Sequence, residues 1–277
     1  MRRFIYFHYI PYSELWELDW LNELFDHPIH LYYKDINQWE NNDCIVTCEP
    51  EKVLGLLPTQ FKFYLVHLSD EFVYQEINEQ VYQRFTFVYR NHFKLNIPSH
   101  CLCFPLGYKK GFIKNKQKSL LLDRKYIWSF VGSIRNERKQ MIEEMKKVSD
   151  SYFIHSTSGF NTQDCLPTNE YFDILYQSFF IPCGIGNSSV DTFRVYEALE
   201  CGCIPIVLKN SIYQPYSYWE KIFPNETLPF IIIEEWFQIK DAIQPFLENI
   251  KIKQKQVYYW YQVYKSKLKQ KIQQSLN

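Results

Sequence analysis

Residues 178–208 read SFFIPCGIGNSSVDTFRVYEALECGCIPIVL, which is the pattern of a complete strand–loop–helix–strand unit. The apolar run at its start predicts a buried strand, and Ile204–Leu208 predicts a second one. Residues 191–200 have helical periodicity and are followed by Gly202, which suits the left-handed turn that ends a helix. Strands that are apolar on both faces and separated by helices indicate a parallel sheet with helices on both sides.

The same alternation of short apolar runs and amphipathic stretches extends along the chain. Further strands are expected at residues 4–9, 44–47, 63–68, 86–89, 101–104, 127–131, 152–155 and 230–233. Further helices are expected at residues 13–25, 136–148, 169–176 and 234–249. We therefore expect an α/β protein built from doubly wound, Rossmann-like sheets.

A polar, lysine-rich segment at residues 107–119 predicts a linker between two domains. We expect an N-terminal domain over residues 1–115 and a C-terminal domain over residues 116–250. Residues 251–277 are rich in lysine and glutamine and contain aromatic residues at helical spacing. They predict a C-terminal amphipathic helix that packs back on the domains.

The composition excludes several classes of function. Lysine plus arginine and aspartate plus glutamate number 31 each, so the net charge is zero and general nucleic-acid binding is disfavoured. No run approaches the roughly 20 apolar residues of a membrane-spanning helix, and the N-terminus lacks a signal-peptide pattern. We expect a cytoplasmic globular protein without a transmembrane segment.

The eight cysteines are too sparse for a disulfide framework, and we expect free thiols. The pairs Cys101-x-Cys103 and Cys201-x-Cys203 lie in apolar runs, where cysteine commonly acts as a small hydrophobic residue. No Cys-x-x-Cys pair or histidine cluster completes a zinc site. We therefore expect no metal.

The loop within residues 178–208 has the features of a phosphate-binding site. A loop of small residues that opens a helix presents free N–H groups and the positive end of the helix dipole. The expected contributors are Gly184, Gly186 and Asn187 in the loop, with Asp191 or Thr192 as the helix cap.

Two charged residues on the following helix extend this prediction. Arg194 lies in the first turn and adds a bidentate donor. Glu197 follows at i+3 on the same face, where its carboxylate could accept hydrogen bonds from ribose hydroxyls. The alternative is a surface ion pair between the two residues beside an ordinary helix N-terminus.

A second loop shows the same arrangement of a strand, small residues and a helix start. Gly132 and Ser133 allow close approach of a ligand, and Arg135 and Arg138 supply positive charge. The alternative is a soluble helix with arginines in its first turns. Convergence of Arg135 and Arg194 at the carboxyl edge of one sheet favours the binding site.

These motifs resemble those of exostosin-like glycosyltransferases, that is, glycosyltransferase family 47 and its relatives. The resemblance is carried by Pro182-Cys-Gly184, by DTFRVYEALECGCIPIV over residues 191–207, and by WSFVGSxR over residues 128–135. It implies a GT-B architecture with two domains facing across a cleft, a nucleotide-sugar in the second domain and an acceptor in the first. It also implies inversion at the anomeric carbon, with Arg194 contacting the diphosphate and Glu197 the nucleotide.

Inverting transfer needs a proton acceptor on the acceptor side. The strand at residues 63–68 is followed by Asp70 and Glu71, so both are candidate catalytic bases, although either could cap the next helix. We expect His67 to be a buried core histidine, and the next candidates for the base are His92 and the acceptor itself.

We interpret the chain as a glycosyltransferase that moves a sugar from a nucleotide diphosphate sugar, expected to be UDP-linked, to an acceptor hydroxyl on a glycan. No cofactor or metal is expected, because arginines and helix dipoles can stabilise the leaving diphosphate. One alternative is a glycan- or nucleotide-binding protein that keeps the GT-B fold without turnover. A second, an NAD enzyme, lacks the GxGxxG loop, since YIPYS occupies residues 9–13 after the first strand.

Overall fold

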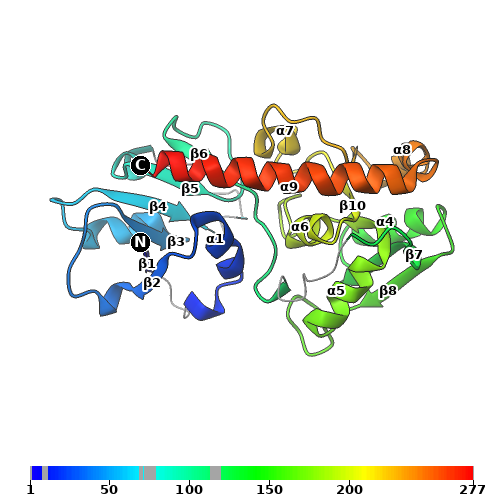
Figure 1. The fold of residues 1–277 in the computed structure, drawn as a ribbon, viewed down its shortest axis with the longest axis horizontal. Coiled ribbons are helices and arrows are strands. Elements are labelled where there is room, and N and C mark those ends of the chain that lie inside the picture. Colours follow the sequence, from blue (N-terminus) through cyan, green and yellow to red (C-terminus); the bar gives the residue numbers. More distant parts are fainter. Residues whose placement is uncertain (1, 8–11, 69–70, 72–78, 113–119, 277) are drawn as a thin grey trace. The chain divides into compact units, whose positions relative to one another are not determined.

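The computed structural model describes residues 2–7, 12–68, 71, 79–112 and 120–276 (Figure 1). The chain divides into two compact units. Unit 1 comprises Met1–Leu106 together with Leu268–Asn277, and unit 2 comprises Gly107–Lys267. Each unit is built on one parallel β-sheet.

The sheet of unit 1 has the strand order β2-β1-β3-β4-β5-β6. Its strands are β1 (Arg3–Tyr6), β2 (Ile29–Tyr32), β3 (Asp43–Thr47), β4 (Phe63–His67), β5 (Phe87–Arg90) and β6 (Cys101–Cys103). All neighbours pair in parallel. The sequence does not predict β2, because this edge strand is only four residues long and includes the polar His30. The chain leaves the sheet in opposite directions from β1 and β3, which makes this pair the topological switch point of unit 1.

Helices cover both faces of this sheet. They are α1 (Leu18–Phe25), α2 (Pro50–Val53) and α3 (Glu79–Gln83), with short 3-10 helices at Tyr12–Glu14, Tyr33–Asp35 and Leu54–Leu56. One face packs Ile5, Ile45 and Leu65 against side chains of α2 and α3. On the other face, the ring of Phe25 from α1 lies 5.0 Å from that of Phe4 and 5.1 Å from that of Tyr89. Alternate residues of the strands therefore serve two separate layers.

The sheet of unit 2 has the strand order β11-β10-β9-β7-β8. Its strands are β7 (Tyr126–Gly132), β8 (Tyr152–Ser156), β9 (Ser178–Cys183), β10 (Ile204–Leu208) and β11 (Ile231–Ile233), all parallel. Each strand was expected from the sequence to within two residues at either end. The switch point lies between β7 and β9, the two strands that precede the predicted phosphate-binding loops.

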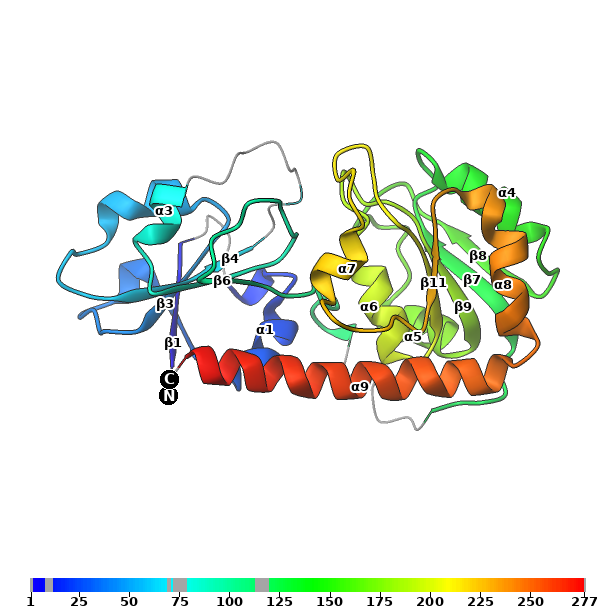
Figure 2. The ribbon, with the colours of Figure 1, turned by 90° about the horizontal axis from the view of Figure 1, so that it is seen from above.

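Two pairs of helices enclose this sheet. The helices of unit 2 are α4 (Arg138–Lys146), α5 (Thr168–Tyr176), α6 (Phe193–Glu200), α7 (Tyr218–Ile222) and α8 (Ile239–Leu247), with a 3-10 helix at Trp236–Gln238. Figure 2 shows α4 and α8 together on one face, with α5 and α6 on the other. Helix α6 follows β9 in the chain and contacts both β9 and β10. Its N-terminal end therefore lies at the carboxyl edge of the sheet.

The boundary between the units lies before the segment predicted to be a linker. The expected boundary follows residue 115, whereas the structure divides the chain between Leu106 and Gly107. Tyr108 and Phe112 are both 1% exposed. The Phe112 ring lies 5.3 Å from that of Phe172 on α5. Burial of these aromatic rings joins the start of the lysine-rich segment to unit 2.

The long helix α9 (Ile250–Ser275) contributes to both units, which divide after Lys267. In unit 2, Nζ of Lys265 lies 2.6 Å from Oε1 of Glu200 at the end of α6, and both side chains are buried. In unit 1, the Tyr89 hydroxyl and the Ser275 hydroxyl are 2.8 Å apart. Across the described part of the chain, no helix has the length and hydropathy that a membrane span requires.

We predict that Lys265→Met destabilises unit 2. The change removes the cation that neutralises the Glu200 carboxylate, whose side chain is 0% exposed. Removal of one partner from a buried ion pair typically lowers the free energy of unfolding by about 3 to 5 kcal/mol. Urea denaturation of the whole chain measures the difference.

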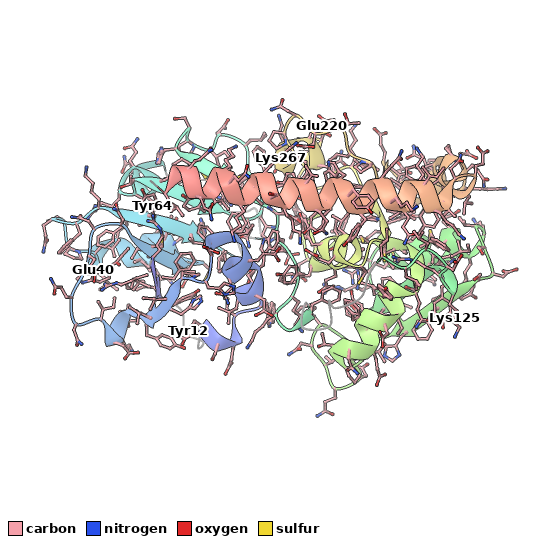
Figure 3. All side chains as sticks on the ribbon, in the orientation of Figure 1. Tyr12, Glu40, Tyr64, Lys125, Glu220 and Lys267 are labelled. Carbon is pink, nitrogen blue, oxygen red and sulfur yellow. The ribbon has the colours of Figure 1, made fainter. Side chains whose placement is uncertain are left out.

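Lys267→Met is the matched control. Lys267, labelled on α9 in Figure 3, lies 3.0 Å from Oε1 of Glu226 and its side chain is 61% exposed. An exposed ion pair contributes less than about 1 kcal/mol. Equally small effects of the two substitutions would contradict a structural role for the buried pair.

Candidate functional site

The two predicted loops meet at the switch point of unit 2. One follows β7 and the other follows β9, and these strands are neighbours in the sheet. We call residues 132–138 and 184–194 the two-loop site. Nη2 of Arg135 donates to Oδ1 of Asn187 at 2.9 Å, and Nη2 of Arg138 donates to the carbonyl of Ile185 at 2.6 Å. Both bonds join one loop to the other.

Arg194, in the first turn of α6, packs against the end of β7. Its Nη2 donates to the carbonyl oxygen of Val131 at 2.7 Å, and its guanidinium lies 4.8 Å from the ring centroid of Phe130. Its Nε is buried without a hydrogen-bond partner among the described residues. The guanidinium is therefore held in one place and retains donor capacity.

Gly132 makes this contact possible. Its φ is +144°, a backbone conformation that L side chains rarely adopt, and a Cβ there would lie 2.5 Å from Nη2 of Arg194. The sequence predicts that Gly132 lets a ligand approach the backbone. In the structure, the guanidinium of Arg194 occupies the space beside Gly132.

Arg138 and Glu137 link the two loops through hydrogen bonds. Arg138 is 6% exposed and also donates to the carbonyl of Ser133 at 3.2 Å, while Glu137 accepts a hydrogen bond from the N–H of Ile185 at 2.6 Å. Burial, together with the nearby charge of Arg194, lowers the pKa of Arg138 to about 9. A Cβ at Gly184 would lie 2.7 Å from Cγ of Arg138, so the absence of a side chain at Gly184 makes room for the Arg138 side chain. Glu137 is not among the residues predicted from the sequence.

Arg135 and Asn187 lie at the exposed rim of the site. Gly186 donates its backbone N–H to the carbonyl of Ser189 at 2.8 Å, which closes the loop after β9. Of the predicted arginines, Arg135 is solvent-exposed, Arg194 is partly buried and Arg138 is buried. Arg135 and Arg194 can therefore face a ligand, and Arg138 positions the loops.

Glu197 lies one turn further along α6 and is 5% exposed. Its Oε2 accepts a hydrogen bond from the hydroxyl of Tyr171 at 2.7 Å, and its Oε1 accepts one from the N–H of Lys109 at 3.3 Å. Burial raises the pKa of Glu197, and these two hydrogen bonds oppose the effect. Tyr171 and Lys109 are not among the residues predicted from the sequence, since neither belongs to a recognisable motif.

The prediction that the side chain of Asp191 or Thr192 caps α6 is wrong. Thr192 occupies the N-cap position of α6, but its side chain makes no capping hydrogen bond, and Oγ1 is buried without a partner among the described residues. Asp191 is 1% exposed, and its carboxylate accepts hydrogen bonds from the hydroxyls of Tyr196 at 2.6 Å and Tyr218 at 2.7 Å. Two phenol donors hold this carboxylate in the interior.

The candidate bases follow β4 in unit 1. Asp70 lies outside the described residues, and Glu71 is partly buried. His67 is 5% exposed, and its Nδ1 lies 2.7 Å from the hydroxyl of Tyr82, which confirms that it is a core histidine. His92 is 3% exposed.

The cysteine pairs do not share one environment. Cys201 and Cys203 are buried at the end of α6, and Nη1 of Arg124 donates to Sγ of Cys203 at 3.1 Å. Cys101 and Cys103 are partly buried on β6. All eight cysteines are free. The residues that the structure describes contain no group of three or more histidine, cysteine, aspartate or glutamate side chains placed to hold a metal.

Residues 108–277 match the family model of the RXYLT1 C-terminal domain, which is more than half of the chain. The chain belongs to the RXYLT1 C-terminal domain family. The match includes the two-loop site and all the residues of unit 2 described above as contacting it. The resemblance to exostosin-like enzymes stays a prediction.

A human protein, ribitol-5-phosphate xylosyltransferase 1, is 25% identical to this chain over 193 residues. The alignment covers 61% of this chain and 42% of the human protein. The chain therefore aligns with less than half the length of this relative.

Two solved structures have the same fold. An α1,3-fucosyltransferase aligns with a TM-score of 0.52 and 13% identity, covering 93% of this chain and 81% of that chain. An α1,3-fucosyltransferase with GDP aligns with the same TM-score and coverages at 14% identity. The likeness confirms the predicted GT-B class.

We predict that Glu197 contributes a pH dependence to the stability of unit 2. Burial raises its pKa above the ordinary value of 4.5, so the folded chain keeps this proton to a higher pH than the unfolded chain. The resulting contribution to stability is complete below pH 4.5 and falls as the pH rises through the folded pKa. Glu197→Gln should abolish this dependence.

Urea denaturation at several pH values above 4.5 tests this expectation. The stability of Glu197→Gln relative to the wild type should increase by up to about 1.4 kcal/mol for each pH unit within that window. Glu143→Gln, at an exposed position of α4, is the control. A difference between Glu197→Gln and the wild type that stays constant with pH would contradict the prediction.

Proposed function

We propose that this chain is a glycosyltransferase that binds the diphosphate of a nucleotide-sugar at the two-loop site. One observation carries the proposal. The Arg194 guanidinium is fixed against Val131 and Phe130, at the N-terminus of α6 and at the switch point of a parallel sheet. Open α/β sheets bind ligands at such points, and helix N-termini favour anions.

The charges at the site suit a leaving diphosphate. Arg194 and Arg135 supply positive charge, and the free N–H groups at the start of α6 add partial positive charge. The partly buried Glu137 and the buried Arg138 each form a hydrogen bond to the backbone of Ile185 and hold both loops in place before a ligand arrives. Preorganised donors of this kind stabilise charge that develops in a transition state without having to reorganise. We propose that transfer proceeds in this way without a metal ion.

The proposed substrates follow from the human relative and from the α6 motif. The name of the human relative describes xylosyl transfer to ribitol 5-phosphate, which supports a pentose donor and an acceptor hydroxyl on a glycan or polyol phosphate. We propose a UDP-linked donor and inversion at the anomeric carbon, following the resemblance of the α6 motif. In this scheme an acceptor hydroxyl attacks the anomeric carbon, the bond to the diphosphate breaks, and a base takes the hydroxyl proton.

Arg194→Ala should weaken UDP binding. The variant loses charge-assisted hydrogen bonds to the diphosphate, which should reduce affinity roughly ten- to a hundredfold. Isothermal titration calorimetry with the folded variant measures this loss.

Lys209→Ala is the matched control, because Lys209 follows β10 at the same edge of the sheet and pairs with Glu234. It should bind UDP as the wild type does. Unchanged affinity in Arg194→Ala would remove this arginine from the site, and an equal loss in both variants would indicate only a general effect of charge.

Asp70→Asn should bind UDP normally and transfer sugar slowly. Loss of a general base typically reduces turnover by about 10²- to 10⁴-fold. Glu71→Gln is the internal comparison. Assays in EDTA test at the same time whether transfer proceeds without a metal ion.

Near-normal turnover in both variants would place the base elsewhere. Loss of all transfer in EDTA, with recovery on adding Mn²⁺ or Mg²⁺, would overturn the proposed metal-free mechanism. UDP binding by the wild type with no transfer to any tested acceptor would favour the alternative of a nucleotide-binding protein without turnover.

A further inference from the structure

A large aromatic side chain is exposed beside the two-loop site. Phe160 belongs to the loop after β8, and β8 is the strand next to β7. Its side chain is 54% exposed. Its ring stacks on that of Phe193, with centroids 6.4 Å apart and an interplanar angle of 17°. Phe193 is the first residue of α6 and directly precedes Arg194.

Lys109 connects Phe160 to the buried carboxylate of Glu197. Its Nζ lies 4.8 Å from the centroid of the Phe160 ring and donates to Oδ1 of Asn161 at 2.9 Å. Its backbone N–H donates to Oε1 of Glu197 at 3.3 Å. Phe160 is thus connected to α6 in two ways. It stacks on Phe193, the neighbour of Arg194, and it contacts Lys109, whose backbone N–H bonds to Glu197.

The loop that carries Phe160 is held by its own hydrogen bonds. The carboxylate of Asp164 accepts from the N–H of Ser158 at 2.6 Å and from the hydroxyl of Thr162 at 2.5 Å. The carbonyl of Asp164 accepts a hydrogen bond from Nε2 of His155 at 2.8 Å. A fixed loop that exposes a phenylalanine ring can bind a planar ligand at a low cost in conformational entropy.

We propose that the exposed part of the Phe160 ring is the stacking platform for the base of the nucleotide, while Phe193 stacks on the ring and the Lys109 ammonium lies over it. The inference rests on the proposed function, because it places the nucleoside half of a ligand whose diphosphate lies at Arg194. Every nucleobase has an aromatic face that can stack on such a ring. A base there occupies the β8 side of the switch point, next to the strand that ends at Gly132.

Calorimetry with UDP and with inorganic pyrophosphate separates the two halves of the site. Phe160→Ala should lower UDP affinity about tenfold, within the range of base–aromatic stacking, and leave pyrophosphate binding unchanged. Phe160→Tyr should retain UDP affinity, because it keeps the ring. Arg194→Ala should weaken both ligands.

Phe237→Ala is the matched control. Phe237 is 56% exposed and lies in the 3-10 helix after β11, at the opposite edge of the same sheet from β8. Its replacement should change neither affinity. GDP, ADP and CDP are titrated alongside UDP, so that the identity of the base does not decide the outcome.

The outcomes distinguish the two proposals. If the wild type binds none of the four nucleotides, the proposed function fails and the stacking site fails with it. If it binds a nucleotide and Phe160→Ala binds it equally well, the stacking site is overturned and the proposed function stands. If Phe160→Ala loses nucleotide and pyrophosphate to the same extent, Phe160 acts on the diphosphate region and the stacking proposal is also overturned.

Discussion

The guanidinium of Arg194 reaches the carbonyl of Val131 only because the next residue, Gly132, has no side chain. This contact joins the first turn of α6 to the carboxyl end of β7, two segments far apart in the sequence. The helix that begins there also carries Glu197, and its first residue supports the exposed ring of Phe160. Arg194 therefore fixes the first turn of α6 against β7, and α6 in turn carries Glu197 and Phe193.

Buried and partly buried charged groups support the loops of that site. Glu137, Arg138, Asp191 and Glu197 are buried or partly buried, and each forms hydrogen bonds with another loop or helix. Burial of such groups is costly unless they are partnered, so a loop that moved away would leave a charge without its compensation. The network keeps the loops in one arrangement, while the hydrophobic layers of the two sheets supply the driving force for folding.

Local patterns in the sequence were sufficient for most of the strands and for both loops of the site. A strand, small residues and an arginine near the helix start are contiguous, so Gly132, Arg135 and Arg194 could be selected without a structure. The residues that form hydrogen bonds around the site could not be selected in this way. Glu137 bonds to a residue 48 positions away, Tyr171 to one 26 away, and Lys109 to one 88 away. Asp191 has the residue type of a cap, yet Tyr218 and Tyr196 hold its carboxylate in the interior.

The sequence by itself determined the α/β class, the strand positions of the second unit and the residues of the phosphate-binding pattern, because periodicity and helix-start signals are properties of adjacent residues. The tertiary structure decided the strand order that sets β7 beside β9, the burial that assigns Tyr108 and Phe112 to unit 2, and which arginines remain accessible. These features depend on contacts between distant segments. Whether Arg138 or Arg135 faces solvent is set by what packs over each, and one stretch of sequence does not contain that information.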